Sequence, residues 1–373
     1  MGLYDQPRVL QHLDALQAVE RGETPFPIHV RLELTESCNF SCGFCYTQDP
    51  KRAGQLQAMG ADILKRRKFD FERVMALIDE FADLGVRAIS FTGSGEPLIY
   101  PHMAEVLRRV RERGMLAAIT SNMAMKISDD LMSELAHVKW LRWSMNGGTA
   151  EVYGSTNRPR AGLASHAFEQ VQLNVGRLIE QRRKSGKGPR VNASYIVWPL
   201  NEHDVLNGAR LGHRLGIDSI SFRPDTPVER ISEALSFSPE TAKAIHQAQD
   251  ELNGPEFQVY LEEDRLEDVV KLNDPDLICF YVNHSTYVAA NGDVYPCCYT
   301  RLEGKYAIGN IREQSFRDFW LSAERKRRYD ALKYDMCPAC PYGKTNQMLR
   351  DLYAGAKTSA ELHVKTADPN HFV

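Results

Sequence analysis

The sequence of 373 residues lacks several features that would assign it to a common class of protein. It has no apolar run of the roughly 18 residues that a transmembrane helix requires, so no membrane span is expected. Its first residues lack the basic and then apolar regions of a signal peptide, which predicts a cytoplasmic protein. An excess of charge is also lacking, because 46 basic side chains stand against 49 acidic ones. Without a basic face or stripe, nucleic-acid binding is not expected.

Cysteine is absent from the whole middle of the chain, between Cys45 and Cys279. Clustered cysteines in a cytosolic protein indicate metal or redox sites more often than disulfides. The eight cysteines form one cluster near the start and one near the end: Cys38, Cys42, Cys45, Cys279, Cys297, Cys298, Cys337 and Cys340.

The first three cysteines follow an alternating, strand-like run at residues 29–35 and have the spacing Cys-x3-Cys-x2-Cys. Thiolates favour soft sites such as zinc or iron–sulfur clusters. Structural zinc usually has four ligands, often from Cys-x2-Cys pairs, and this trio fits it poorly. Three thiolates can instead hold three irons of a cubane and leave the fourth open to a small molecule. Three buried cysteines or a partial zinc site are the alternatives.

At these residues the sequence resembles the radical S-adenosylmethionine (SAM) superfamily. The resemblance implies a 4Fe-4S cluster on Cys38, Cys42 and Cys45, with the amine and carboxylate of SAM on the open iron. It implies that an electron from this cluster cleaves SAM to a 5′-deoxyadenosyl radical, which abstracts a hydrogen atom. Phe44 matches the aromatic residue that the family places near the adenine. A flavodoxin- or ferredoxin-type protein is the expected reductant.

A second motif, Ser94-Gly95-Glu96, follows the next strand pattern. Small residues let the backbone approach a ligand, and a carboxylate can face an ammonium group. The segment resembles the Gly-Gly-Glu motif of the family, with serine in place of the first glycine. The resemblance implies that Gly95 and Glu96 hold the amine of SAM, and the serine leaves a detail of the backbone geometry open.

The remaining candidates lie at or near the ends of predicted strands, where barrel enzymes carry their chemistry. The serines and asparagines either cap strand ends or, as in relatives at the fourth strand, lie near the ribose or carboxylate of SAM. The arginines are candidates for binding a carboxylate or a substrate oxygen bidentately. These candidates are Ser121, Asn122, Ser144, Asn146, Arg158, Arg160 and Arg223.

Strand and helix patterns alternate six times over residues 29–225, which predicts a parallel sheet and an α/β fold. Six such units resemble the partial (β/α)6 TIM-like barrel of radical SAM enzymes. A helix over 239–252 and a strand near 257–260 are expected next. The predicted units are an N-terminal cap (1–28), the radical SAM core (29–225), a bridge (226–272), an auxiliary cluster domain (273–345) and a C-terminal helix and tail (346–373).

The second cysteine cluster surrounds a hairpin signal at residues 291–293, Asn-Gly-Asp. Cys279 and Cys297 should lie at the open ends of this hairpin, and Cys337 and Cys340 form a Cys-x2-Cys pair. On chemistry alone, four thiolates suit zinc and an iron–sulfur cluster equally. The spacing resembles the SPASM/twitch extension of radical SAM enzymes, a β-hairpin and helix domain, which implies an auxiliary 4Fe-4S cluster. Because no cysteine follows Cys340, the pattern resembles the shorter twitch form.

Cys298 is left over beside Cys297. One interpretation is a packed thiol, and a second is a substitute ligand for Cys297. The third is a catalytic residue that donates a hydrogen atom to a substrate radical.

The resemblance predicts an epimerase or dehydrogenase that acts on a carbohydrate-like or aminocyclitol small molecule in natural-product biosynthesis. An electron taken by the auxiliary cluster, together with loss of a proton, would turn a secondary alcohol into a ketone, whereas a thiol that returns hydrogen from the opposite face would epimerise the carbon. Maturation of a ribosomal peptide is the alternative, disfavoured because few residues precede Cys38 and the full SPASM cysteine set is absent. A non-enzymatic electron carrier, the alternative of another class, would have no use for an open iron.

Overall fold

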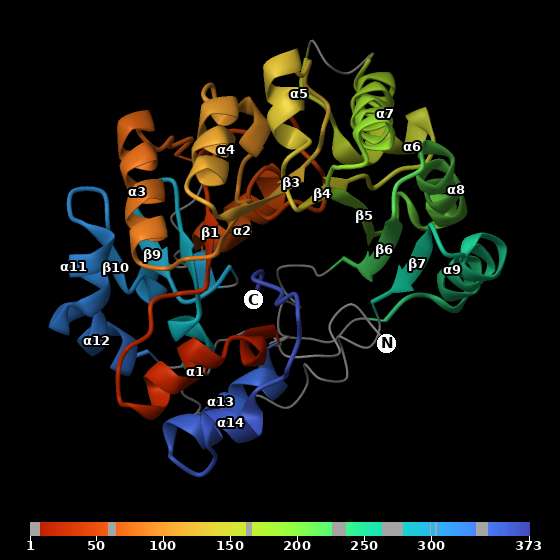
Figure 1. Cartoon of the computed structure of the whole chain (residues 1–373). Coiled ribbons are helices and arrows are strands. Elements are labelled where there is room, and N and C mark those ends of the chain that lie inside the picture. The colour runs from red at the N-terminus through yellow and green to blue at the C-terminus, as the bar shows by residue number, and fades with distance from the viewer. Residues whose placement is uncertain are drawn as a thin grey trace.

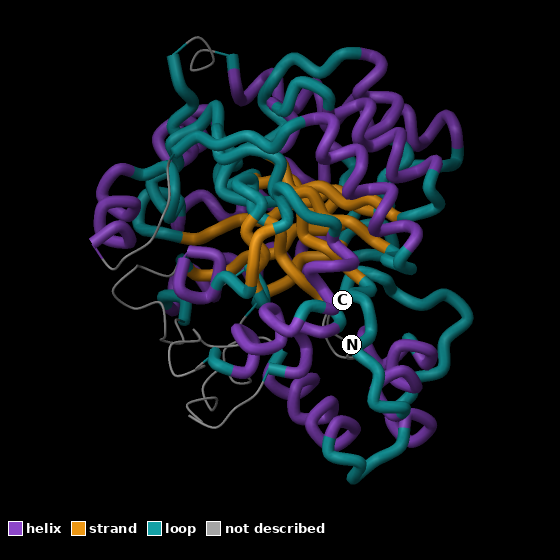
Figure 2. Tube along the Cα trace, turned by 90° about the vertical axis from the view of Figure 1, so that its left-hand side faces the viewer, coloured by secondary structure: helices purple, strands orange, loops and turns teal. Residues whose placement is uncertain are grey.

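The computed structural model describes residues 8–58, 65–161, 166–225, 236–262, 279–298, 300–302, 304–332 and 342–373. One ten-stranded sheet runs through this part of the chain in the order β10-β9-β8-β1-β2-β3-β4-β5-β6-β7. The parallel strands curve into an open arc with helices along its outer side (Figure 1). Figure 2 shows the strands side by side in the middle of the molecule, with helices around them. The predicted α/β class and partial barrel are therefore confirmed.

The six predicted strands pair in parallel in chain order. They are β1 (His29–Leu32), β2 (Ala88–Phe91), β3 (Leu116–Ser121), β4 (Trp140–Ser144), β5 (Arg190–Val197) and β6 (Ser219–Pro224). The α-helices of the same region are α1 (Leu13–Glu20), α2 (Pro50–Ala58), α3 (Phe71–Asp83), α4 (Met103–Glu112), α5 (Asp129–Leu135), α6 (Ala150–Asn157), α7 (Ala167–Ser185) and α8 (Val205–Leu215). Short 3-10 turns lie at η1 (Arg8–Gln11), η2 (Pro97–Ile99) and η3 (Glu202–Asp204).

Helix α3 shows how local sequence sets these boundaries. The side chain of Asp70 caps its first turn by accepting a hydrogen bond from the backbone N–H of Arg73. Val74, Leu77, Ile78 and Phe81 follow at helical spacing and are buried against the sheet. The chain then turns at Gly85, whose φ of 83° is accessible to glycine at little cost.

The predicted strand near 257–260 is present as β7 (Gln258–Leu261), after α9 (Pro239–Leu252). It pairs in parallel with β6 and so becomes a seventh parallel strand of the sheet. The described part of the stretch predicted as a bridge therefore extends the barrel. Residues 226–235 and 263–278 of that stretch lie outside the described residues.

The predicted hairpin is formed by β8 (Ser285–Val288) and β9 (Asp293–Tyr295), with Gly292 in the turn at φ 85°. Strand β8 also pairs in parallel with β1, so the hairpin continues the barrel sheet on its free side. The 3-10 turn η5 (Phe280–Asn283) precedes the hairpin, and the elements that follow it are η6 (Thr300–Leu302), η7 (Gly304–Tyr306), β10 (Gly309–Asn310), α11 (Phe316–Leu321) and α12 (Ala323–Asp330). Phe316 packs edge-on against Phe81 of α3 at 4.9 Å, which joins this region to the main core.

The last residues of the chain, after α13 (Gly343–Tyr353) and α14 (Ser359–Leu362), enter the middle of the arc (Figure 1). Phe372 packs against His29 and Trp140, the first residues of β1 and β4. The imidazole of His29 donates a 2.6 Å hydrogen bond from Nδ1 to the main-chain oxygen of Val373. These residues fill the amino end of the barrel, and the carboxyl ends of the strands carry the candidate site. No helix among the described residues is long and apolar enough to cross a membrane.

Candidate active site

The first three cysteines lie on the loop that follows β1. This loop is held by backbone hydrogen bonds to the end of α6 and the residue that follows it, from Gly43 N to Thr156 O at 3.1 Å and from Ser41 N to Arg158 O at 3.0 Å. Phe40 adds an antiparallel bridge to Pro159. The cysteine loop is therefore fixed against a second loop at the carboxyl end of the barrel.

The three thiols influence one another. Burial raises the pKa of the Cys42 thiol well above its ordinary value, and the neighbouring Cys45 and Cys38 raise it further. Burial, with a contribution from Glu96, raises the pKa of Cys38 to about 12. Because metal ligation requires the thiolate, iron would displace the protons of these thiols on binding.

The donor set fits a cluster better than a single ion. Within the ranges that the structure describes, no three His, Cys, Asp or Glu side chains are grouped to hold one metal ion. Three thiolates would leave a structural zinc one ligand short, whereas Cys38, Cys42 and Cys45 could each bind one iron of a cubane.

Three buried donors in or beside the cysteine loop have no hydrogen-bond partner among the residues that the structure describes: the hydroxyls of Tyr153 and Thr156 and the side-chain nitrogen of Asn39. Tyr153 is only 1% exposed, and its hydroxyl is close enough to Cys42, Glu96 and Cys38 for their charges to raise its pKa, after the larger effect of burial. Buried polar groups are nearly always paired. These orphaned donors therefore fit a bound group with acceptor atoms, such as the sulfides of a cluster or the oxygens of SAM.

The segment Ser94-Gly95-Glu96, called the clamp below, follows β2 and contacts the cysteine loop directly. The backbone N–H of Glu96 donates a 2.9 Å hydrogen bond to the carbonyl of Ser37. A Cβ at Gly95 would lie 2.2 Å from the same carbonyl oxygen, so only glycine permits this approach. The structure thus brings together the two motifs that the sequence singled out.

The carboxylate of Glu96 is buried among backbone donors. It accepts hydrogen bonds from Leu98 N at 3.0 Å and from Asn122 N at 2.7 Å. Burial raises its pKa to about 7 against the effect of these donors. Glu96 therefore ties the end of β2 to the end of β3, and contact of its carboxylate with the amine of SAM stays a prediction.

Two of the other predicted residues serve as strand-end caps. The hydroxyl of Ser121 accepts a 2.8 Å hydrogen bond from Met123 N. Asn146, at a φ of 52°, accepts one from Ile196 N at 2.8 Å and donates to the side chain of Asn157 at 3.1 Å. Ser144 is half-buried at the end of β4, in register with Ser194.

Phe44 and Arg158 meet at Trp198, which follows β5. The ring of Phe44 packs edge-on against Trp198 at 6.0 Å, and the guanidinium of Arg158 lies 5.7 Å from the same ring. Arg158 also pairs with Asp49 at 3.1 Å. A Cβ at Gly43 would collide with Trp198 at 2.2 Å, so the cysteine loop is packed closely on this aromatic group.

The other two predicted arginines belong to different segments of the chain. Arg160 donates to the side-chain oxygen of Gln48 in the cysteine loop at 3.1 Å. Arg223 lies near the end of β6, in register with Ile196.

Sequence reasoning missed the ion pair between Arg52 and Asp225. Arg52, in α2, donates to Asp225 at the end of β6 at 2.9 Å and to the carbonyl of Phe44 at 3.1 Å. The pair spans the mouth of the barrel from the first strand loop to the sixth. No local sequence signal marks it, because its partners are 173 residues apart.

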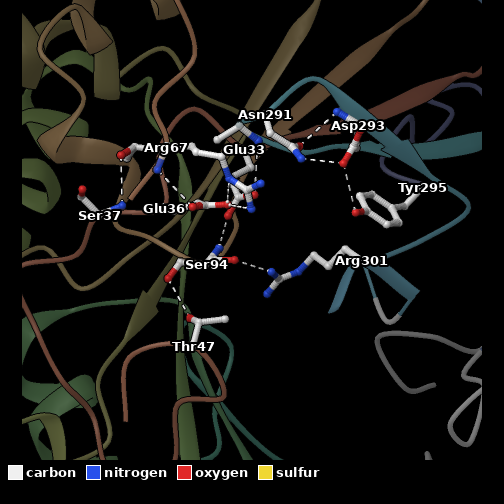
Figure 3. Close-up of polar contacts among 12 residues, drawn as sticks. Glu33, Glu36, Ser37, Thr47, Arg67, Ser94, Asn291, Asp293, Tyr295 and Arg301 are labelled. Carbon is white, nitrogen blue, oxygen red and sulfur yellow. Dashed lines mark hydrogen bonds and ion pairs between the residues drawn. The ribbon is translucent and has the colours of Figure 1, made fainter. Parts of the chain in front are cut away.

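It also missed the contacts of Ser94 with Glu33 and Arg301 (Figure 3). Glu33 directly follows β1, and Arg301 belongs to η6 after the hairpin. Both side chains point to Ser94 from outside the clamp, as does Thr47 from the cysteine loop.

In the second cluster, Cys279 precedes η5, which leads into β8, and Cys297 follows the end of β9. The carbonyl of Cys279 accepts a 2.8 Å hydrogen bond from the hydroxyl of Tyr329, and Cys297 N donates to the hydroxyl of Thr300 at 3.3 Å. Cys337 and Cys340, the other two predicted ligands, lie outside the described residues.

Cys298 lies near the side chains of Arg31, Tyr287 and Arg301. Its charge would influence the titration of all three. Of these, Arg31 belongs to β1 and Tyr287 to β8, two adjacent strands of the sheet. Cys298 also packs against the small apolar cluster of Tyr287, Ala289, Tyr295 and Tyr306, so its thiol lies against the hairpin.

Comparison with protein families gives two matches. Residues 32–211 match the model of the radical SAM superfamily, and residues 279–341 match SPASM, an iron-sulfur cluster-binding domain. Together the matches cover more than half of the chain. The twitch form is not distinguished by these matches and stays a prediction.

Two curated relatives resemble almost the whole chain. The tungsten-containing aldehyde ferredoxin oxidoreductase cofactor-modifying protein of Pyrococcus furiosus is 24% identical over 361 residues, which cover 89% of this chain and 90% of the relative. The antilisterial bacteriocin subtilosin biosynthesis protein AlbA of Bacillus subtilis is 22% identical over 366 residues, which cover 91% of this chain and 74% of AlbA.

Among solved structures, Streptococcus suis SuiB bound to the precursor peptide SuiA has a TM-score of 0.58 with this chain. The match covers 88% of this chain and 72% of SuiB, at 16% identity. At that identity the likeness concerns the fold.

Proposed function

This chain belongs to the radical SAM superfamily and carries a SPASM iron–sulfur cluster-binding domain, and from that premise we propose that it modifies a peptide. SAM and iron–sulfur clusters are its cofactors. The observation that carries the SAM chemistry of this proposal is the contact of the Cys38–Cys45 loop with the clamp, which would bring an open iron and a SAM-binding backbone together.

In this proposal the chain's own residues bind and orient the cofactors. Cys38, Cys42 and Cys45 hold the first cluster, and the backbone around Gly95 approaches the amine of SAM. Phe44 offers an apolar face for the adenine and is held by Trp198. When bound together, the cluster and SAM supply a 5′-deoxyadenosyl radical that abstracts a hydrogen atom from the substrate.

The preference for a peptide rests on the relatives. AlbA takes part in the biosynthesis of a bacteriocin and resembles 91% of this chain. SuiB, bound to a precursor peptide, shares the fold over 88% of it. The carbohydrate-like substrate that the sequence alone favoured has no counterpart in these relatives.

A second candidate is a cofactor-like small molecule. It is favoured by the Pyrococcus furiosus relative, a cofactor-modifying protein that aligns over nearly the full length of both chains. Both candidates use the same site, and they differ in what enters the barrel mouth.

We assign the auxiliary cluster to Cys279, Cys297, Cys337 and Cys340, within a unit of residues 273–345. With four thiolate ligands it would have no open iron, so electron transfer is its role. In this proposal the role of Cys298 determines whether the substrate is epimerised or dehydrogenated. Return of a hydrogen atom from this thiol would invert a carbon and leave a thiyl radical, which an electron from the reductant and a proton would restore, whereas transfer of a further electron to the auxiliary cluster with loss of a proton would oxidise the carbon.

The experiment is transfer of deuterium into 5′-deoxyadenosine. Reduced, iron-loaded protein is incubated with SAM and either a panel of perdeuterated peptides or deuterated sugar nucleotides and aminocyclitols. The proposal expects labelled 5′-deoxyadenosine in the peptide arm. Label from the sugar or aminocyclitol arm alone would contradict the peptide assignment and leave the SAM chemistry intact.

A further inference from the structure

Every polar group of Ser94 is engaged (Figure 3). Its backbone N–H donates to the carboxylate of Glu33. Its carbonyl accepts hydrogen bonds from the hydroxyl of Thr47 and the side-chain nitrogen of Gln48, both at 3.0 Å. Its hydroxyl accepts a 2.5 Å hydrogen bond from Nη1 of Arg301. The first residue of the clamp is thus held from three directions.

Two of these contacts lead to the hairpin of the SPASM region. The carboxylate of Glu33, only 3% exposed, also accepts a hydrogen bond from Ala290 N in the hairpin turn at 3.4 Å. Arg301 follows the hairpin, and its guanidinium lies 5.4 Å from the ring centre of Tyr287 in β8. Two side chains therefore connect the hairpin to Ser94: the carboxylate of Glu33 and the guanidinium of Arg301.

The residue before the clamp provides the space for the contact with Glu33. A Cβ at Gly93 would lie 2.5 Å from Oε1 of Glu33, so glycine is needed for the carboxylate to reach Ser94. Arg301 therefore contacts both Ser94 of the clamp and the ring of Tyr287 in the hairpin.

We propose that Arg301 is a positioning residue through which the SPASM region holds the SAM clamp in its binding geometry. The contact needs a hydroxyl at position 94, and a charge-assisted hydrogen bond from a guanidinium is stronger than a neutral one. The inference rests on the proposed function, because it takes the clamp as the site of SAM. It adds that SAM affinity depends on the segment after the hairpin being seated against Ser94.

The test is a double-mutant cycle on SAM affinity. Arg301→Gln, Ser94→Ala and the double variant are compared with the wild type as full-length, iron-loaded proteins. The dissociation constant of SAM is obtained by titration of the change in the EPR spectrum of the reduced protein. Each single variant should weaken SAM binding about tenfold, as expected for loss of one charge-assisted hydrogen bond. The double variant should be no weaker than the singles, because both changes remove the same contact.

Controls separate positioning from a general loss of structure. Arg301→Lys, which keeps the charge, should restore part of the affinity, and iron content should equal that of the wild type in every variant. Arg327→Gln removes a guanidinium that pairs with Glu324 on an exposed helix and should bind SAM as the wild type does. Ser94→Ala leaves the charged residues in place, so unchanged affinity in this variant would overturn the inference.

Other outcomes are also decisive. Multiplicative losses in the double variant would show independent effects and would overturn the inference while the proposed function stands. A wild-type protein whose spectrum does not respond to SAM would overturn both.

Discussion

The side-chain nitrogen of Asn122, at the end of β3, donates a 2.7 Å hydrogen bond to the side-chain oxygen of Asn39 in the cysteine loop. Asn122 also accepts a hydrogen bond from Ala124 N at 3.0 Å, and its own N–H donates to Glu96 at 2.7 Å. A single asparagine therefore joins the third strand to both motifs of the candidate site. The cysteine loop, the clamp and the end of β3 form one connected polar network.

Replacement of Asn122 should loosen this network. Asn122→Ala leaves Ala124 N unpaired and removes the amide donor of the Asn39 oxygen, which otherwise accepts only from the thiol of Cys38 at 3.8 Å, and an unmet buried group costs about 1–3 kcal/mol. We expect the free energy of unfolding, from urea titration, to fall by roughly that amount. Lys126→Ala, an exposed change in the same loop, should stay within about 0.5 kcal/mol of the wild type. Equal stability of the two variants would refute the structural role of Asn122.

The metal content tests the assignment of the second cysteine cluster. Anaerobically purified wild type should contain about eight iron atoms per chain, four for each of two cubanes. Cys337→Ser should retain about four, because only the auxiliary cluster loses a ligand. Elemental analysis measures both. About four iron atoms with one zinc in the wild type would show that the four later cysteines form a zinc site.

The role of Cys298 determines whether the altered carbon of the substrate is inverted or oxidised. If this thiol returns hydrogen, product made in heavy water carries one deuterium at the altered carbon, because thiol protons exchange with solvent. Cys298→Ala should still form 5′-deoxyadenosine but lose this product. Mass spectrometry of the product measures whether this carbon carries deuterium. An unlabelled product lacking two hydrogens would favour dehydrogenation instead.

The pH dependence of stability should involve His12. Its Nε2–H donates to the carbonyl of Asn370 at 3.1 Å, and its Nδ1 accepts from Arg87 at 2.8 Å, so a second proton would face a guanidinium. Burial first, and Arg87 among the other causes, lower its pKa from 6.5 to about 4. The unfolded state therefore binds more protons between these values, and stability present above pH 6.5 is lost as the pH falls towards 4.

We expect the Tm of the wild type to fall between pH 7.5 and 5.5, and His12→Gln to show a smaller fall. His203→Gln, a change at an exposed histidine, should keep the wild-type slope. An unchanged slope in His12→Gln would mean that other groups carry the acid sensitivity.

The barrel strands were predictable because each repeats a local pattern. Glycines such as Gly85, Gly114 and Gly216 end the helices with positive φ and mark the start of the next strand. The parallel pairing of β8 with β1 joins segments about 250 residues apart in sequence, as in His29 with Ser285, and depends on tertiary packing alone. The pattern therefore predicted the hairpin but not the strand to which it attaches.

In the candidate site, too, local sequence predicts the motifs but not the long-range contacts between them. The cysteine spacing and the clamp are short motifs and could be read locally. Arg301 and Ser94 are 207 residues apart, and neither carries a local signal for the other. Tyr153 was missed because α6 has little apolar periodicity, although Thr149, whose hydroxyl caps its first turn, was a readable sign of the helix.

The most direct test of the central claim is the formation of 5′-deoxyadenosine by reduced, iron-loaded protein supplied with SAM. The account predicts that the wild type forms it and that Cys42→Ser, which removes one ligand of the first cluster, does not. A fully iron-loaded wild type that forms no more 5′-deoxyadenosine than Cys42→Ser would contradict it and would favour an electron carrier.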